Sequence, residues 1–378
     1  MRIGINTRFL LSSKMEGFGW YTFEVVKRMV LAHPEHEFVF FFDRAFDPKF
    51  IFAENVKPVV LFPPARHPFL FIWYFDFALK KALKREQIDV FFSPDGYLAL
   101  GSDVPQVAVI HDLNFEHYPE DIPSLPRWYL RKYFPKFAKK AANILTVSEY
   151  SKQDIVNTYG IEPQKISVAW NGAAPAFQPL TTEQQLATRD RFSNGKPYFI
   201  FVGSIHPRKN VGRLIAAFEA FCKTNPSIDL LIVGTNMWKN GQSAIPTVSK
   251  EVEERIHFTG HVDLNVLSEL MGAAFALSYV PYFEGFGIPL VEAMRCGIPI
   301  ISGNLTSLPE VAGEAALYVD PFNVEAITNA MLQLANDENL QRELSQKSLE
   351  RGQLFSWDHT AEGAWKTILK AAEKADKS

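Results

Sequence analysis

The stretch FALSYVPYFEGFGIPLVEAMRCGIPIIS, Phe275 to Ser302, decides the fold. It reads as a buried strand (Phe275–Pro281), a turn (EGFGI), a helix that starts at Pro289 and a second buried strand (Ile298–Ser302). Proline suits the first position of a helix, because its missing N–H would have no partner there. Strand, helix and strand in succession indicate a parallel sheet. The turn lies at the carboxyl end of a strand, where open parallel sheets bind their ligands.

The same alternation extends over the rest of the chain. Continuous apolar runs, typical of strands buried on both faces, alternate with amphipathic stretches. The runs begin at Ile3, Phe38, Val59, Ile88, Val107, Asn143 and Ile166, and again at Phe199, Leu230, Ile256, Phe275 and Ile298. Between the two sets, Asn171 to Gln185 is rich in Pro, Ala and Thr and reads as a linker. We predict an α/β protein with two doubly wound domains, residues 1–172 and 173–355, facing each other across a cleft, and a C-terminal helix over 356–378 that crosses back to the N-terminal domain.

Composition excludes several classes of protein. The 378 residues carry a net charge of −3, so no global attraction to nucleic acid is expected. Only two cysteines are present, which argues against a disulfide scaffold. We see neither a secretory signal at the N-terminus nor the ~18 uncharged apolar residues that a membrane span needs. A cytoplasmic protein is expected.

Two carboxylates, Glu284 and Glu292, flank the turn. Glu284 precedes Gly-x-Gly and we expect Glu292 in the first turn of the helix, so the two approach a ligand from two sides. Gly285 and Gly287 lack a Cβ and let the backbone approach a ligand, while N–H groups at the helix start favour an anion. Carboxylates that accept hydrogen bonds from vicinal hydroxyls, beside an anion site, suit a ligand with both phosphate and sugar. The alternative is that both acids face water and only favour the helix dipole.

A basic pair follows another predicted strand of the same domain. In VGSIHPRKNVGRLIAAF, Val202 to Phe218, Arg208 and Lys209 stand just before a helix that Asn210 is expected to cap. Two cations beside helix N–H groups predict a diphosphate site, and the alternative is a solvated basic loop. Because this loop and the two-glutamate turn both follow strands of one domain, we favour a single phosphorylated ligand.

These residues resemble a known family. EGFGIPLVEAMRCGIPII is similar to the E-x₇-E signature of the retaining glycosyltransferases of family 4, which have the GT-B architecture. The resemblance covers most of the chain and includes, in the family's order, EGFGWYTFEVV (Glu16–Val26), VIHDLNFEHYPE (Val109–Glu120), TVSEYSKQDIV (Thr146–Val156), NG (Asn171–Gly172), VGSIHPRKN, FTGHV (Phe258–Val262) and SLPEVAGEAALYVDP (Ser307–Pro321). One departure is Ser204, where many members carry a basic residue; the cationic role then falls on Arg208 and Lys209.

The resemblance implies a role for each matching position. Glu292 would bind the ribose hydroxyls of a nucleotide, Glu284 would bind a hydroxyl of the donor sugar, and Arg208 and Lys209 would neutralise the diphosphate. His111, which taken alone is more often structural, would touch the sugar near the reacting centre. The implied site also includes Ser204 after a strand, and Gly260 and Val262 near the base. The backbone of Phe286, Gly287 and Ile288 would lie at the sugar. Gly17 and Gly19 would lie in a first loop that closes over the phosphates and acceptor.

The implied activity is transfer of a hexosyl unit from a nucleotide-diphosphate sugar to an acceptor hydroxyl, with retention at the anomeric carbon. The resemblance points to bacterial surface polysaccharide or glycoconjugate synthesis, to GDP-mannose as the first donor to test, and to a front-side mechanism. No carboxylate pair or His/Cys cluster is placed to hold a metal, so we expect neither metal nor cofactor. An epimerase acting on sugar nucleotides, or a glycogen-synthase-like enzyme, is the alternative on the same fold.

Two aromatic and basic stretches indicate a membrane-linked acceptor. PRWYLRKYFPKFAKKAA, Pro126 to Ala142, has six basic residues and no acidic ones, and PFLFIWYFDFALKKALK, Pro68 to Lys84, is rich in aromatic residues. A basic amphipathic helix can lie on an anionic bilayer. We therefore expect a saccharide or lipid-linked saccharide acceptor, and peripheral contact with the inner face of the cytoplasmic membrane. The alternative is a helix that packs on the sheet and keeps a solvated basic face.

Overall fold

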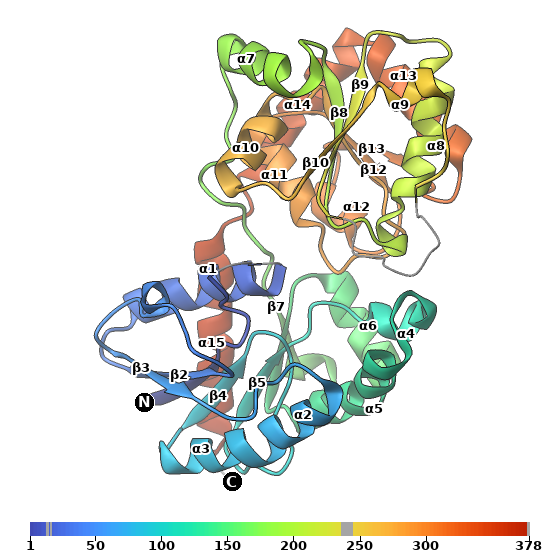
Figure 1. Ribbon diagram of the computed structural model, residues 1–378. Helices are drawn as coiled ribbons and strands as arrows, with labels where there is room; N and C mark the ends of the chain where they lie inside the picture. The colour runs from blue at the N-terminus through green and yellow to red at the C-terminus, as the bar shows by residue number, and fades with distance from the viewer. Residues whose placement is uncertain (13–14, 16, 236–244, 376–378) are drawn as a thin grey trace. The chain divides into compact units, whose positions relative to one another are not determined.

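The computed structural model describes the chain except for residues 13–14, 16, 236–244 and 376–378 (Figure 1). The chain divides into two units, Met1–Asn171 together with Trp357–Ser378, and Gly172–Ser356. Each unit is built around one parallel sheet with helices on both faces. The predicted α/β class, with two Rossmann-like units, is confirmed.

The first unit holds a seven-stranded parallel sheet in the order β3-β2-β1-β4-β5-β6-β7. The chain runs outward from β1 to β3 and then continues from β4 on the other side of β1, which makes the β1/β4 position the switch point where such sheets bind ligands. The strands are β1 Arg2–Asn6, β2 Glu37–Phe42, β3 Val56–Val60, β4 Val90–Ser93, β5 Gln106–Val109, β6 Asn143–Thr146 and β7 Ile166–Val168. The helices are α1 Gly17–Ala32, α2 Pro68–Ile72, a π-helical segment Trp73–Leu79, α3 Lys80–Arg85, α4 Asn114–His117, α5 Ser124–Lys140, α6 Glu149–Tyr159 and α15 Trp357–Ala375.

Strand β2 shows why these segments are apolar along their whole length. Val39 and Phe41 belong to the core beneath the helices of residues 68–85, α5 and α6. Phe38 points to the other face, where its ring centroid lies 6.4 Å from that of Trp365 in α15. All three side chains are fully buried. Because helices cover both faces, a polar residue on either side of the strand would be buried without water.

The last helix, α15, belongs to the first unit although it follows the second in sequence. It packs along α1, and the Trp365 ring stacks on His33 with centroids 3.8 Å apart. Thr360 donates a hydrogen bond of 2.6 Å to the carbonyl of Trp170, and Arg28 donates one of 2.6 Å to Asp358. These contacts tie the C-terminal helix to the start of the chain.

The second unit holds a six-stranded parallel sheet in the order β10-β9-β8-β11-β12-β13, with its switch point between β8 and β11. Figure 1 shows α8 and α13 on one face, and α10, α11 and α14 on the other. The strands are β8 Tyr198–Val202, β9 Asp229–Val233, β10 Ile256–Gly260, β11 Ala276–Tyr279, β12 Ile300–Gly303 and β13 Ala316–Val319. The helices are α7 Thr182–Ser193, α8 Val211–Cys222, α9 Lys250–Glu253, α10 Leu264–Gly272, α11 Ile288–Cys296, α12 Leu308–Ala312, α13 Val324–Asn336 and α14 Glu338–Gly352.

Part of the predicted linker is helical. Helix α7 begins at Thr182, inside Asn171 to Gln185, and has a capping box in which Thr181 accepts from the Gln184 N–H and Gln184 accepts from the Thr181 N–H. Only Thr188 and Ser193 of this helix are buried. A helix without an apolar stripe lacks the periodicity from which helices are predicted.

Candidate functional site

Three strands of the second unit carry a glycine at the same edge of the sheet: β10 ends in Gly260, and β8 and β9 are followed directly by Gly203 and Gly234. The N–H of Gly203 donates to the carbonyl of Val233 at 2.9 Å, and the N–H of Gly234 donates to that of Gly260 at 2.9 Å. A Cβ on Gly234, whose φ is +139°, would lie 2.0 Å from the carbonyl oxygen of Gly203. At Gly260 a Cβ would meet no atom within 4 Å. The backbones at Gly203 and Gly234 are therefore in contact, with no room for a side chain at Gly234. The sheet edge at Gly260 is open to a ligand.

Glu284 is the centre of the polar cluster at this edge. Its Oε1 accepts a hydrogen bond of 2.7 Å from Nη1 of Arg208 and one of 3.1 Å from the hydroxyl of Tyr279. Lys209 Nζ forms an ion pair with the same carboxylate oxygen and a 2.8 Å hydrogen bond with Tyr279. The Glu284 side chain is only 9% exposed. The predicted sugar-binding acid and both predicted phosphate-binding cations are thus in direct contact.

The charges of this cluster follow from its contacts. Burial acts to raise the pKa of Glu284, but Arg208 and Lys209 outweigh it, so the pKa lies below its ordinary value. Burial, followed by the charge of Glu284, raises the pKa of Tyr279 well above its usual range. At neutral pH the cluster therefore contains one carboxylate and two cations. Its net charge is positive, as an anion site requires.

The loop that carries Glu284 is held from two sides. The guanidinium of Arg208 donates to the carbonyl of Phe283 at 3.1 Å, and the backbone carbonyl of Arg208 accepts from the N–H of Tyr282 at 3.1 Å. On the other side, Ser307 donates to the carbonyl of Glu284 at 2.9 Å, and Thr306 accepts from its N–H at 3.3 Å. The φ of Thr306 is +59°, an uncommon conformation for a β-branched residue. The geometry of Glu284 thus depends on loops after β8 and β12 as well as on its own.

Asn210 occupies the first position before α8, but its side chain does not cap the helix, so that prediction is wrong. The backbone is left-handed there, with φ +63°. The side-chain amide donates instead to the carbonyls of Val280 and Pro321, at 2.9 and 2.6 Å. Buried carbonyls need donors, and this requirement prevails over local capping.

Helix α11 presents backbone N–H groups beside the cluster. The Phe286 side chain is buried against the ring of Phe355, with centroids 5.9 Å apart, so only its backbone is available to a ligand. Gly287 has a φ of +91° and precedes the helix. Within the described part of the chain, the N–H groups of Phe286, Gly287 and Ile288 donate no hydrogen bond. Such a helix start, close to two cations, is suited to an anion.

Glu292 lies in the second turn of α11, which corrects the prediction of the first turn. The helix begins at Ile288, one residue before Pro289, so Glu292 is its fifth residue. The half-buried carboxyl has no hydrogen bond or ion pair among the described residues, and burial raises its pKa from the ordinary 4.5 to about 8. A partly buried carboxyl without a partner among the described residues is what a ribose diol would satisfy.

His111 lies at the corresponding edge of the first unit, just after β5. Its Nε2 is 2.8 Å from the carbonyl oxygen of Pro94. A carbonyl only accepts, so Nε2 carries the proton and Nδ1 is left as an acceptor. The rings of Phe18 and Tyr21 pack edge-on at 5.0 and 4.7 Å, and burial lowers the pKa of the imidazole. A neutral His111 can therefore accept a hydrogen bond from a hydroxyl, and it adds no positive charge.

A buried network that the sequence did not reveal supports His111. Asp95 accepts hydrogen bonds of 2.8 Å from Asn6, 2.9 Å from Ser93 and 2.5 Å from Arg8. The Arg8 guanidinium lies 4.1 Å from the ring centroid of Tyr97. This network holds residues 93–97 and so places the Pro94 carbonyl that orients His111. The charged residues Arg8 and Asp95, two positions after the ends of β1 and β4, are the signal in the sequence for this network.

Comparison with known proteins identifies the family. The model of glycosyl transferases group 1 matches residues 184–351, and the model of Glycosyltransferase Family 4 matches residues 16–177. Together the two models cover most of the chain, which belongs to the glycosyltransferases of group 1 and family 4. The prediction of a sugar-transferring enzyme with the GT-B fold is confirmed.

The relatives of this glycosyltransferase include proteins named as mannosyltransferases. O-antigen chain mannosyltransferase B of Escherichia coli is 27% identical over 357 residues, which cover 91% of this chain and 93% of that protein. A GDP-mannose-dependent monoacylated alpha-(1-6)-phosphatidylinositol monomannoside mannosyltransferase of Corynebacterium glutamicum is 26% identical over 206 residues, 52% of this chain and 53% of that one. HepE of Anabaena, solved in complex with UDP-glucose, superposes over 100% of both chains with a TM-score of 0.73 at 16% identity. That superposition shows the fold alone.

The remaining predicted residues of the glycosyltransferase take the following places. Gly17 and Gly19 lie in the first turn of α1 rather than in a loop, and a Cβ on Gly19 would come 2.7 Å from the carbonyl oxygen of Phe9. Close packing of α1 therefore requires a glycine at position 19. Ser204 follows Gly203, and Val262 follows the open end of β10; both are partly buried. Tyr279, Thr306 and Ser307 also contact Glu284 and were not predicted from the sequence. The place of Tyr279 at the end of a buried strand indicates it.

The described residues contain no group of three or more His, Cys, Asp or Glu side chains arranged to hold a metal ion. None of the helices described is long and apolar enough to cross a bilayer.

Proposed function

We propose that this glycosyltransferase moves a mannosyl unit from GDP-mannose to a hydroxyl of a saccharide or lipid-linked saccharide, with retention at the anomeric carbon, in the synthesis of a bacterial surface polysaccharide. The observation that carries the proposal is the contact of Glu284 with Arg208 and Lys209 beside the open N–H groups of residues 286–288. Donor and pathway are supported by the names of the mannosyltransferase relatives. The proposed location is the cytoplasm, in peripheral contact with the inner face of the membrane.

In the proposed reaction the acceptor oxygen attacks C1 of the donor sugar as the bond from C1 to the diphosphate oxygen breaks. Arg208, Lys209 and the N–H groups at α11 stabilise the charge that develops on the departing diphosphate. The acceptor proton passes to that diphosphate on the same face of the sugar, which accounts for retention. Glu284 and His111 bind sugar hydroxyls, and Glu292 binds the ribose. Neither metal nor cofactor enters this scheme.

Binding and product analysis test the proposal. Thermal unfolding is measured with GDP, UDP, ADP and their sugars, and a nucleotide at 100 times its Kd should stabilise the protein by about 2.7 kcal/mol. The preferred donor is then incubated with and without a saccharide acceptor, and the anomeric configuration of the product is read by NMR. Preference for UDP-glucose would overturn the donor, inversion would overturn the mechanism, and conversion of the donor without an acceptor would indicate the epimerase.

Glu292→Gln should stabilise the ligand-free enzyme at high pH. The folded pKa of about 8 lies above the unfolded value of 4.5, so between these pH values the folded chain holds a proton that the unfolded chain has lost. Stability therefore falls as pH rises from about 4.5 to about 8. The Gln variant does not have this dependence. At pH 8.5 the melting temperature of the variant should exceed that of the wild type by an amount worth about 3 to 4 kcal/mol more than at pH 5, because each unit of pKa shift is worth about 1.36 kcal/mol.

The same substitution should weaken nucleotide binding. A ribose diol donates to a carboxylate more strongly than to an amide, so the Kd for GDP should rise about tenfold at pH 8.5. Glu251→Gln, an exposed acid of α9 in the same unit, is the matched control and should change neither property. A variant with reduced stability at pH 8.5 would contradict the assigned protonation, and unchanged GDP binding would contradict the ribose role.

His111→Ala should lower kcat by about tenfold to a hundredfold while GDP binding stays unchanged, because the lost contact is to the sugar. Burial lowers the pKa of the His111 ring, so His111 should not change its charge near pH 6.5. The pH profiles of the wild-type rate and of the His111→Ala rate should therefore have the same shape around that pH. His117→Ala, a partly exposed histidine of the first unit, is the control. Unaltered turnover in His111→Ala would remove the residue from the mechanism.

A further inference from the structure

Two neighbouring helical segments of the first unit carry a concentrated positive charge. Residues 68–85 and α5 together contain ten Lys and Arg against one acid, whereas the rest of the chain contains 29 against 41. The chain as a whole is acidic, with a net charge of −3. One surface of an acidic protein is therefore strongly basic.

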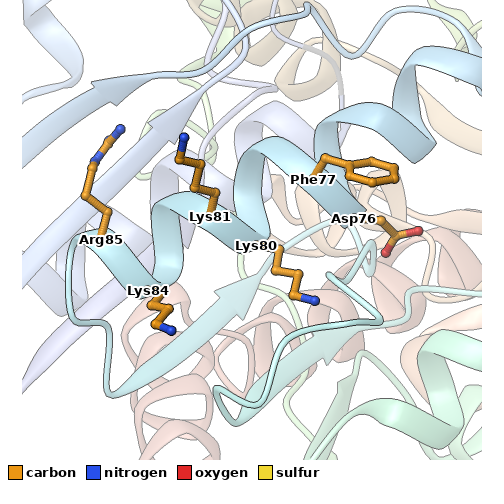
Figure 2. A pocket seen from close by; sticks show the side chains of 6 residues that line it. All are labelled: Asp76, Phe77, Lys80, Lys81, Lys84 and Arg85. Carbon is orange, nitrogen blue, oxygen red and sulfur yellow. The ribbon is translucent and has the colours of Figure 1, made fainter.

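In the first of these segments, every fourth side chain is exposed. The series begins with three aromatic residues, Phe69, Trp73 and Phe77, which are 57%, 60% and 56% exposed, and it continues with Lys81 and Arg85. Figure 2 shows Lys81 and Arg85 projecting from the same side of the helix, and Lys80 and Lys84 from the opposite side. These four basic residues, with Asp76 and Phe77, line an open hollow of about 570 Å³. One stripe thus passes from aromatic to basic along the helix.

Helix α5 repeats this arrangement. Trp128 is 42% exposed, and Lys132, Lys136 and Lys140 follow it at four-residue intervals, all exposed. The Lys132 ammonium lies 4.8 Å from the ring centroid of Trp128. The ring centroids of Trp128 and Phe69 are 6.4 Å apart, so the aromatic ends of the two stripes adjoin. We name the two stripes together the aromatic–basic face.

The aromatic end of this face lies at the edge of the sheet where His111 is found. Arg8, two residues after the end of β1, has its guanidinium 5.1 Å from the ring centroid of Phe71 in α2. Phe71 in turn packs on Tyr129 of α5 at 5.2 Å. Both helices therefore begin at the carboxyl edge of the strands, and their basic ends point away from it.

We propose that the aromatic–basic face docks on an anionic lipid bilayer, with Phe69, Trp73, Phe77 and Trp128 in the interface and the lysines on the headgroups. Tryptophan and phenylalanine beside lysine suit this boundary, because the rings leave water while the cations stay hydrated and meet negative headgroups. Exposed rings gathered in one patch mark an interaction surface, and the charge selects an anionic one. The inference rests on the proposed function in one respect: a lipid-linked acceptor would then reach the edge that carries His111.

Co-sedimentation with vesicles tests the docking. The full chain is mixed with vesicles of phosphatidylcholine alone or with equal parts of phosphatidylglycerol, without any sugar nucleotide, at low and high salt. Wild type should bind only the anionic vesicles, and less at high salt. Lys81→Glu/Lys140→Glu should weaken binding by about tenfold or more. Trp73→Ser/Phe77→Ser, which keeps the charge, should abolish the binding that remains at high salt.

Matched variants of the second unit complete the test. Lys223→Glu/Lys250→Glu makes the same charge change at exposed lysines, and Leu186→Ser/Leu354→Ser removes side chains that are 51% and 52% exposed. Both controls should bind as wild type, and all variants should keep the wild-type melting temperature and GDP affinity. Absence of binding to anionic vesicles, or equal losses in the controls, overturns the inference. Because the assay contains no donor, failure of the proposed transferase activity would leave its result unaffected.

Discussion

Replacing Lys209 by alanine should reduce kcat/KM for transfer by about a hundredfold to a thousandfold, the loss typical when one donor to a developing anion is removed. Lys209 is only 12% exposed and contacts both Tyr279 and Glu284. Without it, Glu284 pairs with Arg208 alone and the net positive charge of the cluster disappears. Arg208→Ala should have an effect of similar size, because it donates to the same carboxylate oxygen. Initial rates with the donor established by the binding screen measure both.

A double variant separates the effect of the cluster's net charge on GDP binding from the effect of Lys209 on transfer. In Lys209→Ala/Glu284→Gln the cluster regains its single positive charge from Arg208, so GDP binding should recover relative to Lys209→Ala while transfer stays low. Lys223→Ala, at the end of α8, is the control for removing a lysine from this unit and should transfer at the wild-type rate. Full activity in both Lys209→Ala and Arg208→Ala would show that the diphosphate is held elsewhere.

Glu284→Gln should lower kcat by about a hundredfold or more and yet preserve or tighten GDP binding. The side chain keeps its size but loses its charge, so Arg208 and Lys209 no longer share their positive charge with a carboxylate and attract the diphosphate more strongly. The sugar hydroxyl that donates to the carboxylate loses its charged acceptor, which slows transfer. Calorimetry with GDP and single-turnover rates with the donor sugar give the two quantities separately.

The stability of this variant gives a second readout. Two partly buried cations without a counter-ion destabilise the ligand-free protein, so its melting temperature should fall and should recover when GDP is added. Glu251→Gln again serves as the control in both assays. If GDP affinity falls in parallel with kcat, Glu284 maintains the loop only and has no separate role at the sugar.

Much of the fold follows from local sequence. Strand β2 is apolar at all but its first residue because helices cover both of its faces, and Pro289 marks the start of α11 because its missing N–H costs nothing there. Helix α7 was not predicted because its buried side chains, Thr188 and Ser193, form no apolar stripe. Strand β13 was also missed, because two of its four residues are at least partly exposed and the continuous apolar signal is lost.

The grouping of Glu284, Arg208 and Lys209 could be predicted, since the carboxyl ends of parallel strands meet at one edge and each residue follows such a strand. Their pairing could not. Arg208 and Glu284 are 76 positions apart, and the distance of 2.7 Å between them depends on Asn210, Thr306 and Ser307, which hold the loops. Sequence periodicity and turn chemistry are local, so they specify which segments form strands and at which edge a ligand binds. Burial, charge and hydrogen-bond partners arise only when distant segments pack. For that reason the shared counter-ion at Glu284 and the raised pKa of Glu292 became evident only in three dimensions.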